Sequence, residues 1–527
     1  MPSDCVDYQS SGYFSKLIID YLDQNDTLKS LYNHFPNIES FELQMHEKSI
    51  NFDARKRQIL CDAIHDQHKN FKISDATQDN ISSLQNINTF TVTTGHQLNL
   101  FTGPIYFIYK IVTTINLAKT LKAAYPTFNF VPIYWMATED HDFEEINYFN
   151  FKGKKIKWMR DSNGPVGRLS TDGLAQVFDV FSKDLDVGDD ADFLKNLFQN
   201  AYLKHKNLAD ATRFIVNELF GKNGLVIIDG DDKSLKNEFV PILKDELLNR
   251  KSFERVMETA EKLKSYKIQV NPREINLFFI ENNLRERIVF EDQKYKINNT
   301  NLEFSETEII QMVADYPEKF SPNVVLRPLY QETILPNLCY IGGGGELAYW
   351  LELKTVFEFH KTTFPILMLR NSALIASKKQ ISKMNSLGIN WNQLFLKKQD
   401  LLTSKTKQLS EFEIDFSEQK KFLKLQFENL LVLAAKTDKS FLGAVLAQQK
   451  KQLNGLDTLE KRLLKAQKRK FLDALEHISN LQNELFPNNG LQERICNFAE
   501  FYNATFIDKV YEALDPFSQN FTIIESN

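Results

Sequence analysis

Cysteine is scarce in this chain of 527 residues, and its four copies, Cys5, Cys61, Cys339 and Cys496, lie far apart without forming a CxxC pair. This spacing argues against a disulfide framework and a zinc site, and it indicates free thiols in a reducing cytoplasm. Cys339 lies in an apolar strand pattern, so we interpret it as a small buried residue rather than a nucleophile.

The sequence also lacks the marks of secretion, of a membrane span and of a basic nucleic-acid surface. The first residues show no basic region before an apolar run, and no apolar stretch reaches about eighteen residues. Lys and Arg total 64 against 69 Asp and Glu, a formal net charge of -5. We therefore expect a cytoplasmic protein that binds neither nucleic acid nor membrane.

The most informative stretch, residues 89–151, predicts a β-α-β unit. The side chains of residues 89–94 follow the alternation typical of a strand, and the polar residues after them end it. An apolar helical pattern follows Pro104. Residues 128–137 form a second apolar strand, which ends in acids around a histidine. Open α/β sheets bind ligands at the carboxyl ends of their strands, so both polar segments are candidate sites.

The rest of the chain predicts an α/β core with inserted pieces. Further strands are expected at 225–229, 323–327, 337–341 and 365–369, the last of them ending at Arg370, with a small β meander at 275–304. The predicted divisions are 1–151, the N-terminal part of the core; 152–221, an insertion; 222–232, a core strand; 233–321, a second insertion; 322–375, the C-terminal part of the core; 376–486, a coiled coil; and 487–527, a tail.

The segment 376–486 has almost no strand signal and no proline. Its leucines, phenylalanines and alanines follow heptad spacing, for example Leu423, Phe427 and Leu430. This pattern predicts a long coiled coil, either an antiparallel hairpin within one chain or a dimer stalk. Apolar residues at helical spacing in the tail, from Ile495 to Val510, need a partner, so we expect the tail to pack back on the core.

The turn after the first strand is the first candidate site, and it comprises Thr94, Gly95, His96, Gln97, Thr102 and Gly103. A glycine-containing turn before a helix can offer backbone N–H groups to an anion, and His96 could neutralise phosphate charge. The alternative is a plain polar turn in which the Thr102 hydroxyl caps the helix.

The acidic segment after the second strand is another candidate, and it comprises Glu139, Asp140, His141 and Asp142, with Asn147 close behind. In an extended segment Glu139 and His141 would face one side, and the two aspartates the other. The acids would raise the pKa of His141 towards working pH, which suits a general base, and a pair of carboxylates could hold a divalent ion or an ammonium group. The alternative is an acidic helix N-terminus.

The glycine run after the strand at 337–341 is the third candidate, and it comprises Gly342, Gly343, Gly344, Gly345, Glu346 and Tyr349. Glycines allow a ligand to approach the backbone closely, although plain mobile loops also contain such runs. Arg327 and Tyr330 lie upstream, and Arg327 would suit a carboxylate or a phosphate. A lone arginine is as often structural.

Three long motifs resemble the BshC family, the cysteine ligases of bacillithiol biosynthesis. They are TGHQLNLFTGPIYFIYK, which ends at Lys110, PIYWMATEDHDFEEIN, and VVLRPLYQETILPNLCYIGGGGELAYW. With the late coiled coil, the match extends over essentially the whole chain. The resemblance implies a Rossmann-like core with inserted connecting subdomains, and a C-terminal α-helical coiled-coil domain that helps form a homodimer. It also implies a reaction in which L-cysteine is joined to the amine of glucosaminyl-malate.

This resemblance, together with the candidate segments, gives a set of expected roles. We expect His96, Asp140, His141 and Asp142 to be catalytic. We expect substrates to contact Thr94, Gly95, Gln97, Thr102, Gly103, Lys110, Glu139, Asn147, Arg327, Tyr330, Gly342, Gly343, Gly344, Gly345, Glu346 and Tyr349.

The energy source and the mechanism stay open at this point. The family core is similar to that of class I nucleotidyl-transferring enzymes, but the chain has no clear HxGH or KMSKS signature. ATP or another nucleotide, with Mg²⁺, can supply the energy, and no metal ligand is assigned. Two alternatives remain, a nucleotidyl-transferring enzyme acting on another small substrate and a non-catalytic coiled-coil scaffold that binds a ligand.

Overall fold

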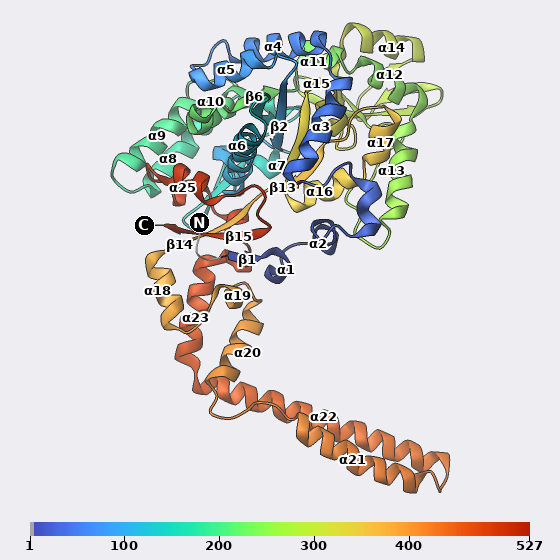
Figure 1. The fold of residues 1–527 in the computed structure, drawn as a ribbon, viewed down its shortest axis with the longest axis vertical. Coiled ribbons are helices and arrows are strands. Elements are labelled where there is room, and N and C mark those ends of the chain that lie inside the picture. The colour runs from blue at the N-terminus through green and yellow to red at the C-terminus, as the bar shows by residue number, and fades with distance from the viewer. Residues whose placement is uncertain (1–4, 527) are drawn as a thin grey trace. The chain divides into compact units, whose positions relative to one another are not determined.

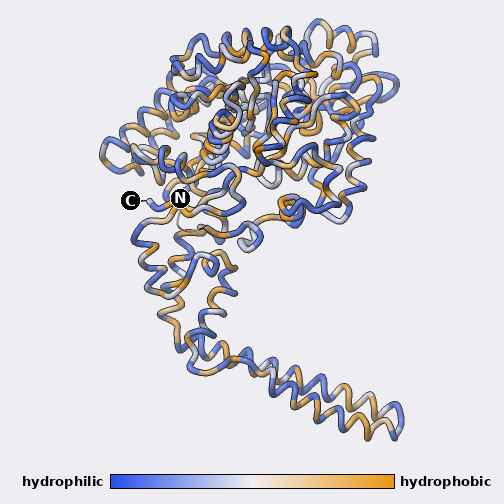
Figure 2. Tube along the Cα trace, viewed as in Figure 1, coloured by the Kyte–Doolittle hydropathy of each residue, from blue (hydrophilic) through white to orange (hydrophobic). Residues whose placement is uncertain are grey.

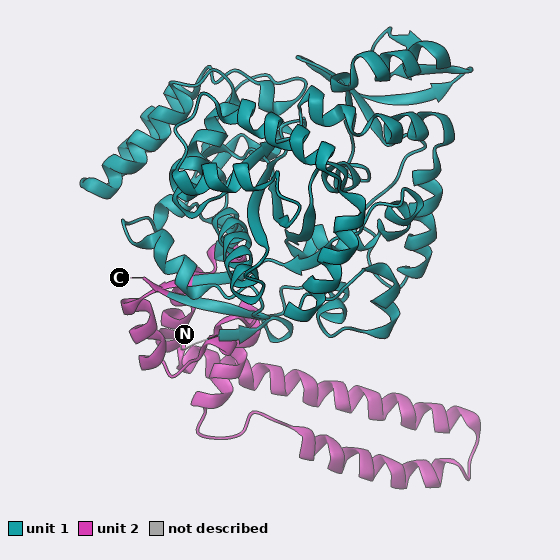
Figure 3. Ribbon diagram, turned by 45° about the horizontal axis from the view of Figure 1, so that its top comes forward, with its two compact units in different colours: residues 1–374, 492–524 teal, residues 375–491, 525–527 magenta. Residues whose placement is uncertain are grey.

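The computed structural model describes residues 5–526, which form two compact units (Figure 3). Unit 1 holds the chain up to residue 374 together with residues 492–524, and unit 2 holds residues 375–491 and the last residues of the chain. Within residues 5–526, no helix combines the length and the apolar character needed to cross a membrane.

A five-stranded parallel sheet forms the centre of unit 1 (Figure 1). Its strands are β2 Thr89–His96, β3 Asn129–Met136, β6 Val226–Asp229, β12 Asn337–Gly342 and β13 Ile366–Leu369, in the order β13-β12-β2-β3-β6. The chain builds outward from β2 in one direction and then reverses at β12, on the other side of β2. This order is that of a Rossmann-like core, so the expected α/β fold is confirmed.

Burial on both faces explains why β2 lies at the middle of the sheet. Phe90 and Val92 pack into an apolar cluster with residues of α6 (Tyr106–Ala124), the helix that connects β2 to β3. The alternate residues Thr91 and Thr93 are also buried, and their hydroxyls donate to Asn337 Oδ1 at 3.2 and 2.8 Å. These bonds satisfy polar groups that burial would otherwise penalise.

The remaining elements of unit 1 precede the sheet, are inserted into it or follow it. The N-terminal segment contains β1 Cys5–Asp7, α1 Tyr8–Ser11, α2 Lys16–Leu22, α3 Ile38–Asn51, α4 Ala54–His68 and α5 Asp75–Ser83. Between β3 and β6 lie α7 Phe143–Ile146, β4 Tyr148–Phe151, β5 Lys154–Lys157, α8 Leu174–Asp184, α9 Asp189–Tyr202 and α10 Leu208–Phe220.

A second insertion lies between β6 and β12. Its helices are α11 Lys233–Asn237, α12 Val240–Asn249, α13 Lys251–Lys262, α14 Glu306–Asp315 and α15 Arg327–Ile334. Its strands are β7 Leu277–Glu281, β8 Leu284–Glu291, β9 Lys294–Ile297, β10 Glu303–Phe304 and β11 Phe320–Pro322, in an antiparallel sheet of order β10-β9-β8-β7-β11. The β meander expected at 275–304 is therefore present.

The strand expected at 323–327 is wrong. The Asn323 side chain accepts the N–H groups of Val325 and Leu326, which makes this segment a turn, and α15 begins at Arg327. Pro328 follows at the start of that helix, where proline is favoured and its missing N–H costs nothing. Apolar composition alone suggested a strand, because Val325 and Leu326 in this turn are buried.

The expected ends of two other elements also need correction. β2 continues through Gly95 to His96 instead of ending before Gly95. β13 is not the last strand, because β14 Ser372–Ser377 and β15 Asn520–Ser526 follow, and β15 pairs antiparallel with β1. Between β12 and β13 lie α16 Gly344–Leu351 and α17 Lys354–Phe359. The helices of the tail are α24 Gln492–Ile495 and α25 Phe506–Ala513, with a short turn of helix at Phe498–Glu500 between them.

Unit 2 is helical, and its longest helices form an antiparallel hairpin. Its helices are α18 Lys378–Ser386, α19 Trp391–Leu394, α20 Lys398–Leu409, α21 Ser417–Ala434, α22 Lys439–Lys470 and α23 Leu472–Leu485. Lys420 on α21 pairs with Asp457 and Glu460 on α22, while Phe427 and Val445 pack nearer the connecting turn. Apolar and polar residues alternate along both helices (Figure 2). Of the two coiled-coil arrangements expected, the hairpin within one chain is present.

We expect His68, on α4, to make unit 1 less stable in acid. Burial, aided by the positive charge of Arg213, lowers the pKa of His68 to about 3. The unfolded chain then binds one more proton than the folded one between about pH 6.5 and 3, so stability falls as the pH falls through this window. Changing His68→Gln should remove up to about 1.4 kcal/mol per pH unit from that slope.

Denaturant unfolding of the wild type and His68→Gln between pH 7 and 4 measures the slope. His65→Gln, an exposed change on the same helix, is the control and should leave the slope as it is in the wild type. Equal slopes for wild type and His68→Gln would contradict the expectation.

Candidate active site

A cavity of about 980 Å³ opens at the carboxyl ends of the parallel strands of unit 1. Its walls include residues that follow β2, β3, β12 and β13, among them Gln97, Asp140, Glu346 and Arg370. The gap between β2 and β12 is where the strand order reverses. Ligands of open α/β sheets bind at this point.

Ten of the residues expected from the sequence line this cavity. They are Gly95, His96, Gln97, Glu139, Asp140, Arg327, Gly343, Gly345, Glu346 and Tyr349. Ten others do not line it: Thr94, Thr102, Gly103, Lys110, His141, Asp142, Asn147, Tyr330, Gly342 and Gly344. The three candidate segments thus meet at one place, but only part of each segment faces it.

An ion pair beneath the cavity joins the first and third segments. Lys110, on α6, is 1% exposed, and its ammonium donates to both carboxylate oxygens of Glu346 at 2.9 and 2.8 Å and to the Gly95 carbonyl. Tyr340 OH and Gly343 N–H also donate to Glu346, each at 2.8 Å. Burial opposes charge on Glu346, but the attraction of Lys110 and these bonds outweigh it, and the pKa of Glu346 is lowered.

His96 lies beside this ion pair, between the rings of Tyr106 and Phe107. Burial, with a smaller contribution from the positive charge of Lys110, lowers the pKa of His96 to about 3. Its Nε2 has no hydrogen-bond partner within residues 5–526. His96 is therefore held as an uncharged ring with an unused nitrogen, and its expected role toward phosphate charge stays a prediction.

Three backbone N–H groups of the turn after β2 are already used in the fold. The N–H of Phe101 donates to Tyr202 OH at 2.7 Å, that of Gly103 to the Leu100 carbonyl, and that of Ile105 to the Cys496 carbonyl. Gly103 has a φ of +65°, and a β-carbon there would lie 2.6 Å from that of Asn99, so glycine is required for the fold of the turn. Thr102 does not cap α6, whose first turn has no side-chain cap.

The acidic segment after β3 is a turn, so the alternation expected for an extended strand is absent. Glu139 and Asp140 both line the cavity. Glu139 pairs with the buried Lys236 at 2.5 Å, and Asp140 accepts from Gln97 Nε2 at 2.9 Å. Asp142 is exposed and lies outside the cavity lining, so its expected catalytic role loses its geometric basis.

His141 is held by an arginine of the second insertion. Arg285 Nη1 lies 2.7 Å from His141 Nδ1. Burial and the positive charge of Arg285 lower the pKa of His141, and they outweigh Asp140 and Asp142, which act in the opposite direction. The expectation that neighbouring acids raise the pKa of His141 is wrong, because burial and Arg285 outweigh them. Nothing in the local sequence indicates that Arg285 lies beside His141.

Several expected residues serve the fold instead. The Thr94 hydroxyl donates to the Ile341 carbonyl, and Tyr330 OH donates to the Gly230 carbonyl. Asn147 is buried and donates to Glu144. Arg327 differs from these, because it lines the cavity between the rings of Trp135 and Tyr340 and contacts Tyr349 OH.

Comparison with known protein families finds matches over nearly the full length of the chain. Residues 1–371 match the family described as "Bacillithiol biosynthesis BshC, N-terminal Rossmann-like domain", and residues 373–526 match "Bacillithiol biosynthesis BshC, C-terminal coiled-coil domain". The chain belongs to the BshC family. The resemblance inferred from the three motifs is thereby confirmed.

Relatives of the BshC family are similar to this chain from end to end. A protein of Flavobacterium psychrophilum is 61% identical and one of Flavobacterium johnsoniae 58% identical, with 99–100% of this chain and 100% of each relative covered. A third, from Christiangramia forsetii, is 53% identical over 99% of both chains. Each relative carries the name "Putative cysteine ligase BshC".

Few patterns in the sequence mark the other polar residues of the cavity in this BshC chain. Arg370 directly follows the expected strand at 365–369, and that position could have marked it. Its guanidinium forms a buried bidentate pair with Glu493 at 2.7 and 3.1 Å. Arg494 reaches the cavity from the tail. Arg273, Arg285 and Arg287 reach it from the second insertion, where nothing in the local pattern distinguishes them.

Proposed function

We propose that this chain is a ligase that joins the carboxyl group of L-cysteine to the amine of glucosaminyl-malate, the last step of bacillithiol biosynthesis. The names of its relatives support the class of reaction. The observation that carries the proposal is the charge of the cavity, which is lined by the arginines 273, 285, 287, 327, 370 and 494 and by Glu139, Asp140, Glu145 and Glu346. Both substrates carry carboxylate and amine groups, and a cavity with both signs of charge suits them.

The residues of the cavity fit the steps of amide formation. Glu139 and Asp140 can attract the substrate ammonium group, with Gln97 orienting Asp140. The amine must lose a proton before it attacks, and His96 is the histidine that lines the cavity where this proton can be accepted. His141 lies outside the cavity lining and acts only by holding Arg285.

An energy source is part of the proposal, because a carboxylate must be activated before an amine can displace an oxygen from it. ATP or another nucleotide supplies the activating group. Within residues 5–526, no set of three or more His, Cys, Asp and Glu side chains is arranged to hold a metal ion. Mg²⁺ would then enter bound to the phosphates, with few protein ligands, as is usual at nucleotide sites.

A mass-spectrometric assay tests the proposal. The purified protein is incubated with glucosaminyl-malate, L-cysteine, ATP and Mg²⁺, alongside mixtures that each lack one component. The expected product has the mass of the cysteinyl conjugate and is absent without protein. Pyrophosphate exchange that depends on a different substrate would favour a nucleotidyl-transferring enzyme, and ligand binding without turnover would favour a scaffold.

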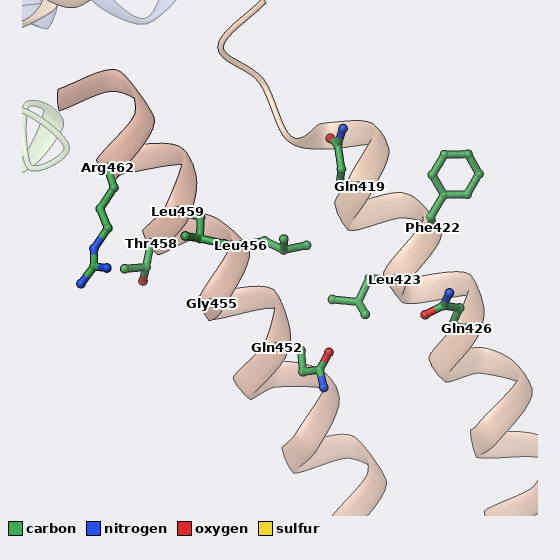
Figure 4. Close-up of a pocket in the computed structure, with 10 residues that line it drawn as sticks. All are labelled: Gln419, Phe422, Leu423, Gln426, Gln452, Gly455, Leu456, Thr458, Leu459 and Arg462. Atoms are coloured by element: carbon green, nitrogen blue, oxygen red, sulfur yellow. The ribbon is translucent and has the colours of Figure 1, made fainter. Parts of the chain in front are cut away.

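The proposal includes a homodimer joined through the hairpin of unit 2. The hairpin exposes several large apolar side chains, including Phe422 at 62% and Leu459 at 52%. Both line an open groove along α21 and α22, and in Figure 4 Leu423 and Leu456 point toward each other while Phe422 points away from α22. Phe422 thus adds little to the hairpin itself, and exposed apolar surface of this kind favours association with a second copy.

Changing Phe422→Glu should therefore convert the dimer to a monomer while leaving the helix content unchanged. A buried charge at an apolar interface is costly, whereas the same charge on an exposed helix face costs little. Light scattering after size-exclusion chromatography measures the mass, and circular dichroism the helix content. Leu425→Glu places the same charge on an exposed leucine of α21 outside the groove lining and should remain dimeric. A monomeric wild type would contradict the dimer.

A further inference from the structure

Three arginines of the second insertion lie on one wall of the cavity. Arg285 and Arg287 are two residues apart on β8, so both project from the same face of the strand. Arg273 precedes β7, the strand that pairs with β8, and also lines the cavity. We call Arg273, Arg285 and Arg287 the meander arginines.

The contacts of the meander arginines leave most of their hydrogen-bonding capacity unused. Arg285 is stacked on Phe278, with its guanidinium carbon 3.9 Å from the ring centroid, and its Nη1 contacts His141. Its Nε is buried and has no partner within the described residues. The side chains of Arg273 and Arg287 form no hydrogen bond or ion pair with any residue from 5 to 526. Asp140 and Glu139 lie close enough to Arg285 to act on its pKa, but none of the three arginines forms an ion pair with an acid among the described residues. Guanidinium groups of this kind, directed at a cavity, are suited to an anionic ligand.

Arg370 lies at a different place along the sheet from the meander arginines. It follows the edge strand β13, whereas Arg285 contacts the segment that follows β3. Three strand spacings separate β13 from β3 in the order β13-β12-β2-β3-β6, which is roughly 14 Å. This separation gives the cavity room for two anionic groups, one toward Arg370 and one toward Arg285.

We propose that the meander arginines bind the phosphoryl groups of the donor that activates the carboxyl group. Guanidinium groups bind phosphate oxygens in pairs of parallel hydrogen bonds, and three of them can follow a chain of phosphates. The chemical class is a nucleoside triphosphate, or an acyl phosphate made from one. The role rests on the proposed ligase function, whereas the binding itself can be measured without turnover.

With a nucleoside triphosphate as the donor, the carboxyl group is activated in a first step and the amide bond forms in a second. A carboxylate oxygen of cysteine attacks a phosphorus atom, an O–P bond forms, and pyrophosphate or the nucleoside diphosphate leaves with the electron pair. The amine of the second substrate then attacks the acyl carbon, a C–N bond forms, and the nucleoside monophosphate or inorganic phosphate leaves. The amine gives up one proton. The meander arginines would stabilise the charge that accumulates on the departing phosphates.

Isothermal titration calorimetry with the full chain tests the phosphoryl subsite. The probes are ATP with Mg²⁺, inorganic pyrophosphate, inorganic phosphate and L-malate, each titrated into the wild type and the double variant Arg273→Gln/Arg287→Gln. Both side chains are exposed and without partners in the described chain, so the variant should fold. The double variant Lys204→Gln/Lys206→Gln removes the same charge from exposed positions outside the cavity lining and is the matched control.

We expect the wild type to bind pyrophosphate and ATP, and the arginine variant to bind them at least about tenfold more weakly, because each lost charge-assisted bond has an effect of that order. Binding of L-malate should change less than about twofold, and the lysine variant should behave like the wild type. Binding of inorganic phosphate alone would identify an acyl phosphate as the donor; binding of ATP and pyrophosphate would identify a nucleotide.

Three results would overturn the subsite. No phosphate compound binds the wild type, the arginine variant binds pyrophosphate as tightly as the wild type does, or the arginine variant loses affinity for malate and for pyrophosphate by the same factor. The outcome is separable from that of the ligase assay. Conjugate formation without binding of any phosphate compound would reject the subsite and keep the function. Pyrophosphate binding that depends on the meander arginines, with no conjugate formed, would reject the function and keep the subsite.

Discussion

Replacing Lys110 with methionine is expected to lower the free energy of unfolding of unit 1 by about 3 kcal/mol. Lys110 is 1% exposed and is the cation that compensates the charge of Glu346. Breaking a buried ion pair from one side costs about 3–5 kcal/mol, because the remaining charge is left without its partner. The lower end applies because the Glu346 side chain keeps 28% exposure toward the cavity and can stay hydrated.

The double variant Lys110→Met/Glu346→Gln is the matched control for this prediction. It removes both charges, and the amide can still accept a hydrogen bond from Tyr340 OH, so more than half of the lost stability should return. Denaturant unfolding at pH 7 measures the wild type, Lys110→Met, Glu346→Gln and the double variant, and the double-mutant cycle isolates the coupling between the two residues. Additive losses from the two changes would show that the pair contributes nothing.

The part of the fold that could be predicted from the sequence is the part set by local patterns. Residues 89–137 form consecutive, fully buried strands around an apolar helix, and each of these elements leaves a pattern of its own. Arg370 and Glu346 also lie where strands end. The strand predicted at 323–327 is wrong because that prediction also rests on a local pattern. The apolar residues of this turn have the composition of a strand, and only Pro328 marks the helix that follows.

The rest of the candidate site depends on contacts between distant parts of the chain. Arg494 lies 124 positions after Arg370 in the sequence, yet both line one cavity. The pKa of His141 is lowered instead of raised because Arg285, from another insertion, reaches it. His96 is uncharged because folding buries it beside Lys110. The sequence patterns indicate segments that meet at the cavity, but the charges of these groups depend on neighbours that only the folded chain provides.

His96 carries the largest expected effect on activity. Changing His96→Ala should lower the turnover of the proposed ligase by roughly two to four orders of magnitude, the range for losing a group that transfers a proton in the transition state. The side chain lines the cavity and its Nε2 is unused within residues 5–526, so its removal breaks no described hydrogen bond. Thermal unfolding should therefore change little, and His68→Gln, a change at a buried histidine outside the cavity, should keep its turnover.

The pH dependence separates His96 from an ordinary histidine base. Its pKa of about 3 means that the ring is already unprotonated throughout the range from pH 5 to 8. A profile of kcat/KM for the wild type should consequently show no fall near pH 6.5 that belongs to His96, whereas a solvated histidine would lose its basic form there. Two results would reject this role: full activity of His96→Ala, or an inflection near pH 6.5 that disappears in His96→Asn. If turnover collapses and the profile stays flat, His96 acts from the cavity as an uncharged ring, and the fold around Lys110 and Tyr106, which holds it uncharged, becomes part of the chemistry.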